Sequence, residues 1–309
     1  MRNTIGLLII VAAVLVNPLD GGAADPGTPS KAVAPEAVNI DQLRQQAKQG
    51  NAEAQNELGD MYYNGDGVTQ DDSQAAAWYQ KAADQGFAGA QLSLGVMYLD
   101  GRGVAQDDRQ AMSWYQKAAD QGLAEAQTNL GWMYEEGRGV AQDYGQALAW
   151  YEKAAGQGDA RAQFNLGWMF AQGRSVAQDD RQAVAWYQKA ADQGLAEAEY
   201  NLGAMYLNGH GVPQDERQAV TWLRQAASQG LAEAQNNLGV MYAEGRGVAK
   251  DYVEAYAWFS LAAASDDLSA AQKEIVIQGG DAVRKRMTPE QIAAGEERVK
   301  ALRVTITGK

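Results

Sequence analysis

Residues 124–158 read AEAQTNLGWMYEEGRGVAQDYGQALAWYEKAAGQG, and this stretch decides the fold because the chain repeats it. The dipeptide Leu130-Gly131 recurs every 36 residues in six copies that cover residues 51–266. The leucines are Leu58, Leu94, Leu130, Leu166, Leu202 and Leu238, and a glycine follows each of them. A tryptophan has the same period, at Trp78, Trp114, Trp150, Trp186, Trp222 and Trp258. Self-similarity at a fixed period indicates a repeat architecture.

The first half of each repeat has the pattern of an amphipathic helix. Ala54, Leu58 and Met61 lie four and three residues apart, which places them on one stripe of a helix. Gly65-Asp66-Gly67 then interrupts the pattern, because glycine readily adopts the positive φ that favours a helix C-terminus. We therefore predict a helix that ends near residue 64 and a turn after it.

The second half of each repeat has the pattern of another helix. Asp71 is followed three residues later by Gln74, which is typical of a capping box, and this spacing recurs in every copy. Ala75, Trp78 and Ala82 then form the apolar stripe. Each repeat is therefore predicted to be a helical hairpin.

One hairpin cannot cover its own apolar stripe. Burying the ring of Trp78, at ~200 Å² and ~25 cal/mol per Å², would contribute up to about 5 kcal/mol, and a neighbouring hairpin must supply the cover. The repeats are therefore expected to stack. We predict an all-α fold, a right-handed α-solenoid of six 36-residue hairpins, with the first helices lining a concave face.

Both ends of the array depart from the repeat. Residues 39–50 place Leu43 and Ala47 in the register of a second helix and predict an N-terminal capping helix. Residues 267–309 follow the last repeat, lose its glycine pattern and predict C-terminal capping helices. Within them, Thr288 and Gln291 form another capping box around Pro289. Atypical terminal units are what a solenoid needs to remain soluble.

The N-terminus has the layout of an export signal. A charged start precedes the apolar run from Ile5 to Val16, and small residues follow up to Ala24. We predict a cleaved signal peptide at residues 1–24, a disordered linker at residues 25–38, and a periplasmic or secreted protein. The alternative is an uncleaved membrane anchor, which fits less well because a spanning helix needs roughly 20 apolar residues.

Composition excludes several functions. The chain has 309 residues and a formal net charge of -13, so an electrostatic nucleic-acid footprint is not expected. It contains no cysteine, which excludes disulfides and cysteine-ligated metals. It contains one histidine, His210, so a histidine-based zinc site is not expected either. We expect no cofactor, no metal, and no membrane contact after signal cleavage.

The repeated unit, with its Leu-Gly, Met-Tyr, Gly-x-Gly-Val and Trp-Tyr-x-Lys-Ala-Ala elements, resembles the SEL-one-like repeat, a relative of the tetratricopeptide repeat. The resemblance covers all six copies. It implies an α-solenoid that serves as an adaptor or scaffold, often in signalling and cell-envelope processes. A cysteine-rich branch of the family has been linked to β-lactam binding or hydrolysis, and this chain lacks the cysteines of that branch.

Residues that suggest chemistry have simpler explanations. His210 lies in Gly209-His210-Gly211, a turn position that arginine occupies in most copies, and we expect an exposed turn residue. The aspartates that recur at the start of each second helix are explained by capping, since lone carboxylates one repeat apart cannot supply the ligands that calcium needs. Ser175 replaces the second glycine of its turn. Either this position does not strictly require glycine, or the backbone of the fourth copy is strained there.

Positions that differ between copies are the candidates for partner binding. By similarity to tetratricopeptide arrays, three variable positions of the first helix face the concave groove. They predict an aromatic strip and an asparagine ladder, formed by Trp132, Trp168, Phe164, Tyr200, Asn129, Asn165, Asn201 and Asn237. Amides can pair with an extended peptide backbone while aromatic rings hold its side chains. Alternatively, the asparagines tie neighbouring helices together and the tryptophans fill gaps between repeats.

Three functions remain open from the sequence. The favoured hypothesis is a monomeric, non-enzymatic, exported scaffold that binds a protein or peptide in its groove. A second is an enzyme acting on the cell wall or on β-lactams, which would need paired carboxylates such as Glu135 and Glu136. Adjacent residues on a helix point about 100° apart, which argues against that pair. The third is a structural spacer in the envelope.

Overall fold

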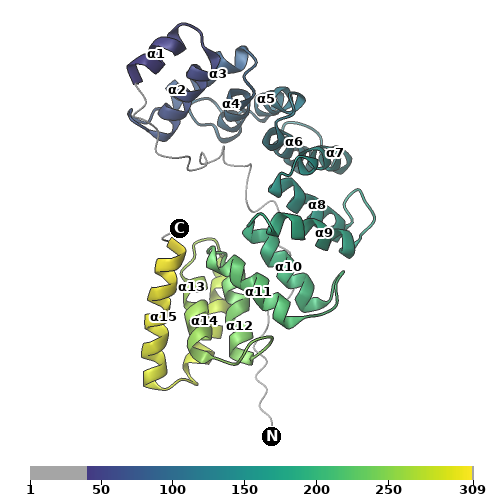
Figure 1. Cartoon of the computed structure of the whole chain (residues 1–309), viewed down its shortest axis with the longest axis vertical. Helices are drawn as coiled ribbons and strands as arrows, with labels where there is room; N and C mark the ends of the chain where they lie inside the picture. The colour runs from purple at the N-terminus through teal and green to yellow at the C-terminus, as the bar shows by residue number, and fades with distance from the viewer. Residues whose placement is uncertain (1–39, 308–309) are drawn as a thin grey trace. The chain divides into compact units, whose positions relative to one another are not determined.

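The computed structural model describes residues 40–307, and these form an all-helical chain (Figure 1). The helices are α1 (Ile40–Lys48), α2 (Ala52–Asn64), α3 (Asp72–Asp84), α4 (Ala88–Asp100), α5 (Asp108–Asp120), α6 (Ala124–Glu136), α7 (Tyr144–Gly156), α8 (Ala160–Gln172), α9 (Asp180–Ala191), α10 (Ala196–Asn208), α11 (Glu216–Ser228), α12 (Ala232–Glu244), α13 (Tyr252–Ala263), α14 (Ala270–Arg284) and α15 (Pro289–Thr307). The described residues contain no strand. The expected signal peptide and linker lie outside this range.

Helices α2 to α13 alternate between two roles. We call α2, α4, α6, α8, α10 and α12 the A helices, and α3, α5, α7, α9, α11 and α13 the B helices. The contacts divide the described chain into two compact units, residues 40–166 and residues 167–307, with the boundary inside α8. Consecutive helices pack from α1 to α7 in one unit and from α9 to α13 in the other. The predicted α-solenoid of stacked hairpins is confirmed.

The ends of the helices follow local sequence signals. In the third repeat, α6 ends at Gly137, whose φ is 68°. Asp143 caps α7, since its side chain accepts hydrogen bonds from the backbone of Gly145 and Gln146. The prediction of the second hydrogen bond of this capping box, from the backbone N–H of Asp143 to the side chain of Gln146, is wrong. The backbone N–H of Asp143 instead donates to the carbonyl of Tyr134, 2.9 Å away, which joins the two helices of the hairpin.

The glycine of each Leu-Gly pair lets a B helix approach closely. A Cβ atom at Gly131 would lie 2.7 Å from the ring of Tyr151, well inside van der Waals contact. The same arrangement pairs Gly59 with Tyr79, Gly95 with Tyr115, and Gly167 with Tyr187. These tyrosines are at most 2% exposed. In these four hairpins the glycine therefore creates the space for the most deeply buried aromatic ring.

The prediction that tryptophan is the hidden aromatic residue of each repeat needs correction. Trp114 and Trp258 are buried, whereas Trp78, Trp150, Trp186 and Trp222 are only partly buried. The tryptophan and the tyrosine are adjacent on the B helix, so their side chains point about 100° apart. The tyrosine faces the A helix of its own hairpin, and the tryptophan packs on the preceding hairpin. Trp114 lies among Ala76, Tyr79 and their neighbours.

A lysine covers the outer face of four of these tryptophans. The ammonium groups of Lys81, Lys117, Lys153 and Lys189 lie 3.6 to 3.7 Å from the ring centroids of Trp78, Trp114, Trp150 and Trp186. Such cation–π contacts suit half-exposed rings, because the ammonium group remains hydrated while its stem covers carbon. In the last repeat, the equivalent position holds Leu261, beside Trp258.

Neighbouring repeats are also joined by ion pairs. The guanidinium of Arg138, in the turn after α6, contacts Asp108 at the start of α5 at 2.6 and 3.0 Å. The pair Arg102–Asp72 repeats this bidentate contact, and Arg246–Glu216 occupies the same positions with a 2.7 Å contact. The glycine after each arginine has a positive φ, and a Cβ at Gly139 would lie 2.5 Å from the carbonyl oxygen of Asp108.

Ser175 occupies this glycine position in the fourth repeat. Its φ is 56°, and it is the only non-glycine residue with a positive φ in the described chain. Left-handed backbone costs a residue with a Cβ roughly 1 kcal/mol. We predict that Ser175→Gly raises the free energy of unfolding by about 1 kcal/mol, measured by urea denaturation. Ser113→Gly, in the middle of α5, is the control and should lower it by about 0.5–1 kcal/mol; equal effects of the two changes would refute the strain.

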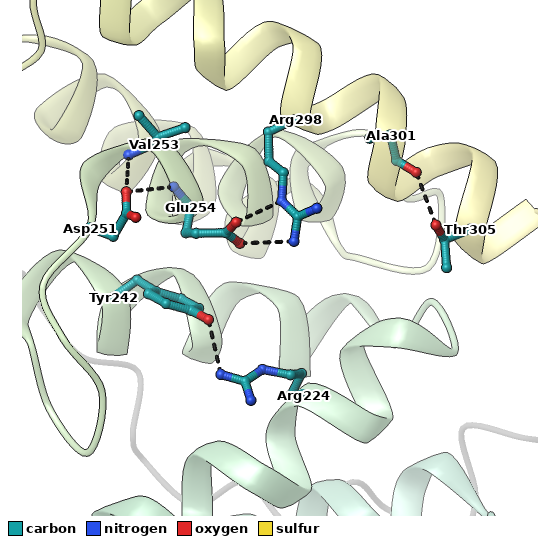
Figure 2. Close-up of polar contacts among 8 residues, drawn as sticks. All are labelled: Arg224, Tyr242, Asp251, Val253, Glu254, Arg298, Ala301 and Thr305. Atoms are coloured by element: carbon teal, nitrogen blue, oxygen red, sulfur yellow. Dashed lines mark hydrogen bonds and ion pairs between the residues drawn. The ribbon is translucent and has the colours of Figure 1, made fainter.

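The C-terminal cap ends with a long helix that returns to the array. Helix α15 packs against α13 and, more weakly, α11. Leu302 is buried among residues of these helices together with Val299 and Ile306. Figure 2 shows Arg298 of α15 contacting Glu254 of α13, with the shortest distance 2.6 Å. This packing covers Trp258, which is 3% exposed.

The start of α15 and the middle of α14 settle two expectations about the C-terminus. Thr288 and Gln291 exchange both hydrogen bonds of the predicted capping box, at 3.0 and 3.3 Å. The 36-residue glycine pattern does not continue into this region, since Ile275 stands one repeat after Gly239. Gly279 of α14 lies against the ring of Phe259, as Gly239 does, although it follows Gly239 by more than one repeat length.

None of the described helices combines the length and the apolar character that a membrane span requires.

Candidate partner-binding surface

One stripe of each A helix carries two of the three variable positions, and the third, which holds Phe164 and Tyr200, lies next to it. The stripe consists of residues four, three and four apart, and in α6 these are Glu125, Asn129, Trp132 and Glu136. We call the equivalent residues of every A helix the A-helix stripe. The two ends of the stripe in α6 are exposed, and its two central residues are buried.

The eight residues predicted to bind a partner are all buried within the structure. Their exposed fractions run from 0% at Asn201 to 9% at Trp132. The set is Trp132, Trp168, Phe164, Tyr200, Asn129, Asn165, Asn201 and Asn237, and it is divided between the two units at residue 166. These side chains can therefore offer a partner only a small part of their surface.

Three of the asparagines face buried tyrosine hydroxyls. Burial raises the pKa of Tyr151, and the side chain of Asn165 acts in the opposite direction by hydrogen bonding. Asn129 stands in the same relation to Tyr115, and Asn201 to Tyr187. This pairing was not predicted from the sequence, although a constant spacing of 14 residues separates each tyrosine from its asparagine.

Asn237 differs because the preceding repeat has Leu223 in place of the tyrosine. Its amide donates instead to the hydroxyl of Tyr200 on the preceding A helix, at 3.4 Å. Burial raises the pKa of Tyr200 to about 12. This contact ties neighbouring A helices, which is the structural role that the sequence left open for the asparagines.

The two tryptophans of the A-helix stripe lie beside arginines of the following turns. The guanidinium of Arg138 is 5.3 Å from the ring centroid of Trp132, and that of Arg174 is 5.6 Å from the ring of Trp168. Trp132 packs with Leu92, Val96 and other residues of α4. Its indole nitrogen is buried and has no hydrogen-bond partner.

The first A helix carries a carboxylate where inner repeats have apolar residues. Asp60 accepts hydrogen bonds from the hydroxyl of Tyr79 at 2.7 Å and from the amide of Asn56 at 3.0 Å. Partial burial raises the pKa of Asp60, the bond from Tyr79 opposes this, and the charge of Glu57 adds to the rise. The carboxylate is therefore held in a site that disfavours its charged form.

This site predicts a pH-dependent stability. Since the pKa of Asp60 is raised on folding, the folded chain binds the proton more tightly, and its contribution is lost as pH rises from about 3.8 through the folded pKa. We expect Asp60→Asn, which can still accept from Tyr79, to be more stable than the parent at pH 7 and to lose this advantage towards pH 3.5. Urea denaturation across this range measures the difference, and a difference independent of pH would contradict the prediction.

The other residues that suggested chemistry are far from forming a reactive pair. Glu135 is 1% exposed, and its carboxylate accepts a hydrogen bond from the hydroxyl of Tyr151 at 2.7 Å. Glu136 is exposed, on a different face of α6. His210 is an exposed residue of the turn between Gly209 and Gly211. The aspartates at the starts of the B helices serve as caps, as predicted.

Stacked helical hairpins of constant length, with shared buried residues and a variable stripe, define an α-solenoid repeat protein. The chain belongs to the Sel1 repeat family. The family's repeat model matches residues 52–87, 88–123, 124–159, 160–195, 196–231 and 232–267. The SEL-one-like assignment is thus confirmed, and proteins with these repeats are generally protein-interaction scaffolds.

Several solved structures are similar to this chain, among them the following two. A Sel1 repeat protein from Oxalobacter formigenes is 34% identical, with a TM-score of 0.67, and the match covers 72% of this chain and 98% of that one. The protein c5321, described as a protective antigen of uropathogenic Escherichia coli with an SLR fold, is 32% identical over 85% of this chain and 71% of its own, with a TM-score of 0.42.

A curated relative matches over a shorter stretch. The secretory immunoglobulin A-binding protein EsiB of Escherichia coli O6:H1 (strain CFT073) is 47% identical over 45 residues. The match covers 15% of this chain and spans only 9% of the length of EsiB.

Proposed function

We propose that this protein is an exported, non-enzymatic scaffold that binds an extended segment of a partner protein along its A-helix stripe. One observation carries the proposal: the repeats agree at the residues that stack them and differ along this stripe. Gly131 and Tyr151 have equivalents in most repeats because they build the hairpin. Residue 132 is tryptophan, whereas the same position holds Asp60 in the first repeat and Val96 in the second.

The stripe offers suitable chemistry for a peptide. Its exposed ends are polar, and its centre in α6 combines an aromatic ring with an indole N–H that has no partner within the protein. The small exposed fraction of Trp132 means that recognition would depend on the rims of the stripe as much as on its centre.

Export rests on the sequence of residues 1–24 and on one relative. The apolar run from Ile5 to Val16 has the length of a signal-peptide core. EsiB carries the name of a protein that binds secretory immunoglobulin A, which is consistent with protein binding outside the cytoplasm by a relative with a similar stretch. Mass spectrometry of the protein from a fractionated cell should find a chain that begins near Asp25 outside the cytoplasm.

Site-specific photo-crosslinking tests the binding surface. A photoreactive residue at Glu136, at the exposed end of the stripe in α6, is expected to crosslink to a defined partner in cells. The control is the same residue at Ala149, which is exposed on the B helix α7. Crosslinks of equal yield from both positions, or from Ala149 alone, would reject the assignment of the A helices as the binding surface.

A further inference from the structure

One buried polar position recurs in the A helices and links each of them to the helix before it. The fourth residue of the A helix is glutamine in five of the six repeats, namely Gln55, Gln91, Gln127, Gln163 and Gln235. These glutamines are 3–6% exposed. Each side-chain amide donates to the backbone carbonyl of the residue eight positions earlier, at 2.9–3.5 Å. The bond therefore ties the start of these A helices to the end of the preceding helix.

The oxygen of the same amide group is used as well. In the first three repeats it accepts a hydrogen bond from the glutamine that follows 30 residues later, at 2.7–2.8 Å. In the third repeat, for example, Gln127 donates to the carbonyl of Ala119 and accepts from Gln157. An amide presents a donor and an acceptor at the same time, so it satisfies both neighbours without any change of protonation.

Glu199 takes this position in the fifth repeat. It is 4% exposed, and one of its carboxylate oxygens accepts a hydrogen bond from the amide of Gln229 at 2.9 Å. This contact is the equivalent of the one from Gln157 to the amide oxygen of Gln127. The second carboxylate oxygen therefore takes the place of the amide nitrogen, which in the other repeats donates to a carbonyl.

The carbonyl that this second oxygen meets is arranged as in the other repeats. It belongs to Ala191, the last residue of α9, and accepts from the backbone N–H of Gly194 at 2.9 Å. The carbonyl of Ala119 accepts from Gly122 at the same distance. An ionised carboxylate has no hydrogen to donate to such a carbonyl, whereas a protonated carboxyl group has one. Only the protonated form of Glu199 can therefore reproduce the bond of the other repeats.

The charges around Glu199 do not favour its ionised form. The charged residues around the end of α9, the start of α10, the second half of α11 and the start of α12 are Lys189, Asp192, Glu197, Arg224 and Glu233. Both cations are exposed, Lys189 on the ring of Trp186 at 3.7 Å and Arg224 donating to Tyr242 at 3.0 Å. The acids outnumber the cations, and nearby acids disfavour another negative charge. Arg161, near the start of α8, belongs to the other unit.

Burial outweighs the remaining influence, which is the helix itself. Glu199 lies in the first turn of α10, where the helix dipole favours a negative charge. That effect lowers a carboxyl pKa by less than about 1, whereas full burial can raise it by about 3–5. The buried tyrosines of the same region, Tyr187 and Tyr200, also have raised pKa values because of their burial, so they remain neutral.

We propose that Glu199 is a pH-sensitive joint between the fourth and fifth repeats. When protonated, its carboxyl group donates to the carbonyl of Ala191, as glutamine does elsewhere. When the pH rises, the proton passes to solvent and this bond is lost. The junction of α9 and α10 is therefore held more tightly in acid than at neutral or alkaline pH.

Glu199→Gln tests the joint by restoring the residue of the other repeats. The folded chain holds the proton more tightly than the unfolded chain, so the contribution of the carboxyl group is present below about pH 4.3 and is lost as the pH rises. Urea denaturation gives the folding equilibrium constants of variant and parent. Their ratio is expected to be at least about 10-fold larger at about pH 8 than at about pH 4.5. Asp60 titrates in both chains and cancels, and a ratio independent of pH would overturn the proposal.

Glu197→Gln is the matched control. Glu197 lies two residues earlier in α10 and is partly exposed. An acid in the first turn of a helix is favourable, so removal of this charge should not stabilise the chain at about pH 8. Equal stabilisation by Glu197→Gln and Glu199→Gln would show only a general relief of negative charge and would refute the joint.

Two further measurements place the effect. Gln127→Glu introduces a carboxyl group between Ala119 and Gln157 of the other unit, and it should destabilise the chain more at about pH 8 than at about pH 4.5. Hydrogen exchange at about pH 8 should be faster in the parent than in Glu199→Gln for peptides that cover the junction of α9 and α10, and equal for peptides of α14. A pH-independent cost of Gln127→Glu, or unchanged exchange at the junction, would contradict the proposal.

Discussion

Replacing Gly131 by alanine is expected to lower the free energy of unfolding by about 2–3 kcal/mol. The added methyl group would lie 2.7 Å from two ring carbons of Tyr151. That ring is fully buried, and its hydroxyl is held by Glu135, so it cannot move away without breaking the 2.7 Å hydrogen bond. Inserting a carbon into a core that cannot relax typically costs this amount.

Gly156→Ala is the matched control for this substitution. Gly156 is the last residue of α7 in the same unit, and no atom lies within 4 Å of the position that its Cβ would take. Here the change should raise the free energy of unfolding by about 0.5 kcal/mol, since alanine favours the helix. The midpoints of urea denaturation, compared at unchanged slope, measure both effects. A loss at Gly131 no larger than at Gly156 would show that the Leu-Gly pair is not a packing device.

Replacing Tyr151 by phenylalanine is expected to cost about 1.5–3 kcal/mol. The ring would remain, but the carboxylate of Glu135, which is 1% exposed, would lose its hydrogen bond from the hydroxyl. Hydrogen bonds to charged groups contribute more than neutral ones, and a buried acceptor that loses its donor retains the cost of leaving water.

Replacing Tyr115 by phenylalanine tests whether the cost of losing the hydroxyl depends on the charge of its hydrogen-bond partner. Tyr115 is as deeply buried as Tyr151, but its hydroxyl faces the amide of Asn129, and Asp100 and Arg138 act on it only through their charges. We expect Tyr115→Phe to cost less than about 1 kcal/mol. Both variants can be compared by urea denaturation, with near-UV circular dichroism to show that the packing of the other aromatic residues is retained. Equal costs at the two positions would mean that Glu135 does not depend on Tyr151.

The architecture could be predicted from the sequence because its signals are local. Glycine at Gly137 and aspartate at Asp143 act on the backbone within a few residues, so they mark the ends of α6 and the start of α7 without knowledge of the rest. The period of 36 residues then requires stacking, because each hairpin repeats the same apolar stripe.

The details of packing could not be predicted in the same way. Trp150 and Tyr151 are adjacent and both aromatic, and which of them is buried depends on the neighbour that each one meets. Periodicity places Asn165 on the stripe, but whether its amide meets a partner or the hydroxyl of Tyr151 depends on a contact between helices. The burial of the predicted site residues is therefore a property of the assembled array, which periodicity alone does not reveal.

Leu261 at the position of the stacked lysines has a consequence for the evolution of the array. Interior repeats such as the second, with Lys117 on Trp114, present a charged outer face that would not accept an apolar helix. The final repeat provides most of the apolar surface on which α15 packs, α11 of the repeat before it adds a weaker contact, and Glu254 of α13 pairs with Arg298. The surface that receives α15 is thus formed by the last two repeats. Interior repeats could be duplicated or deleted by recombination, and α15 would still pack on the same surface.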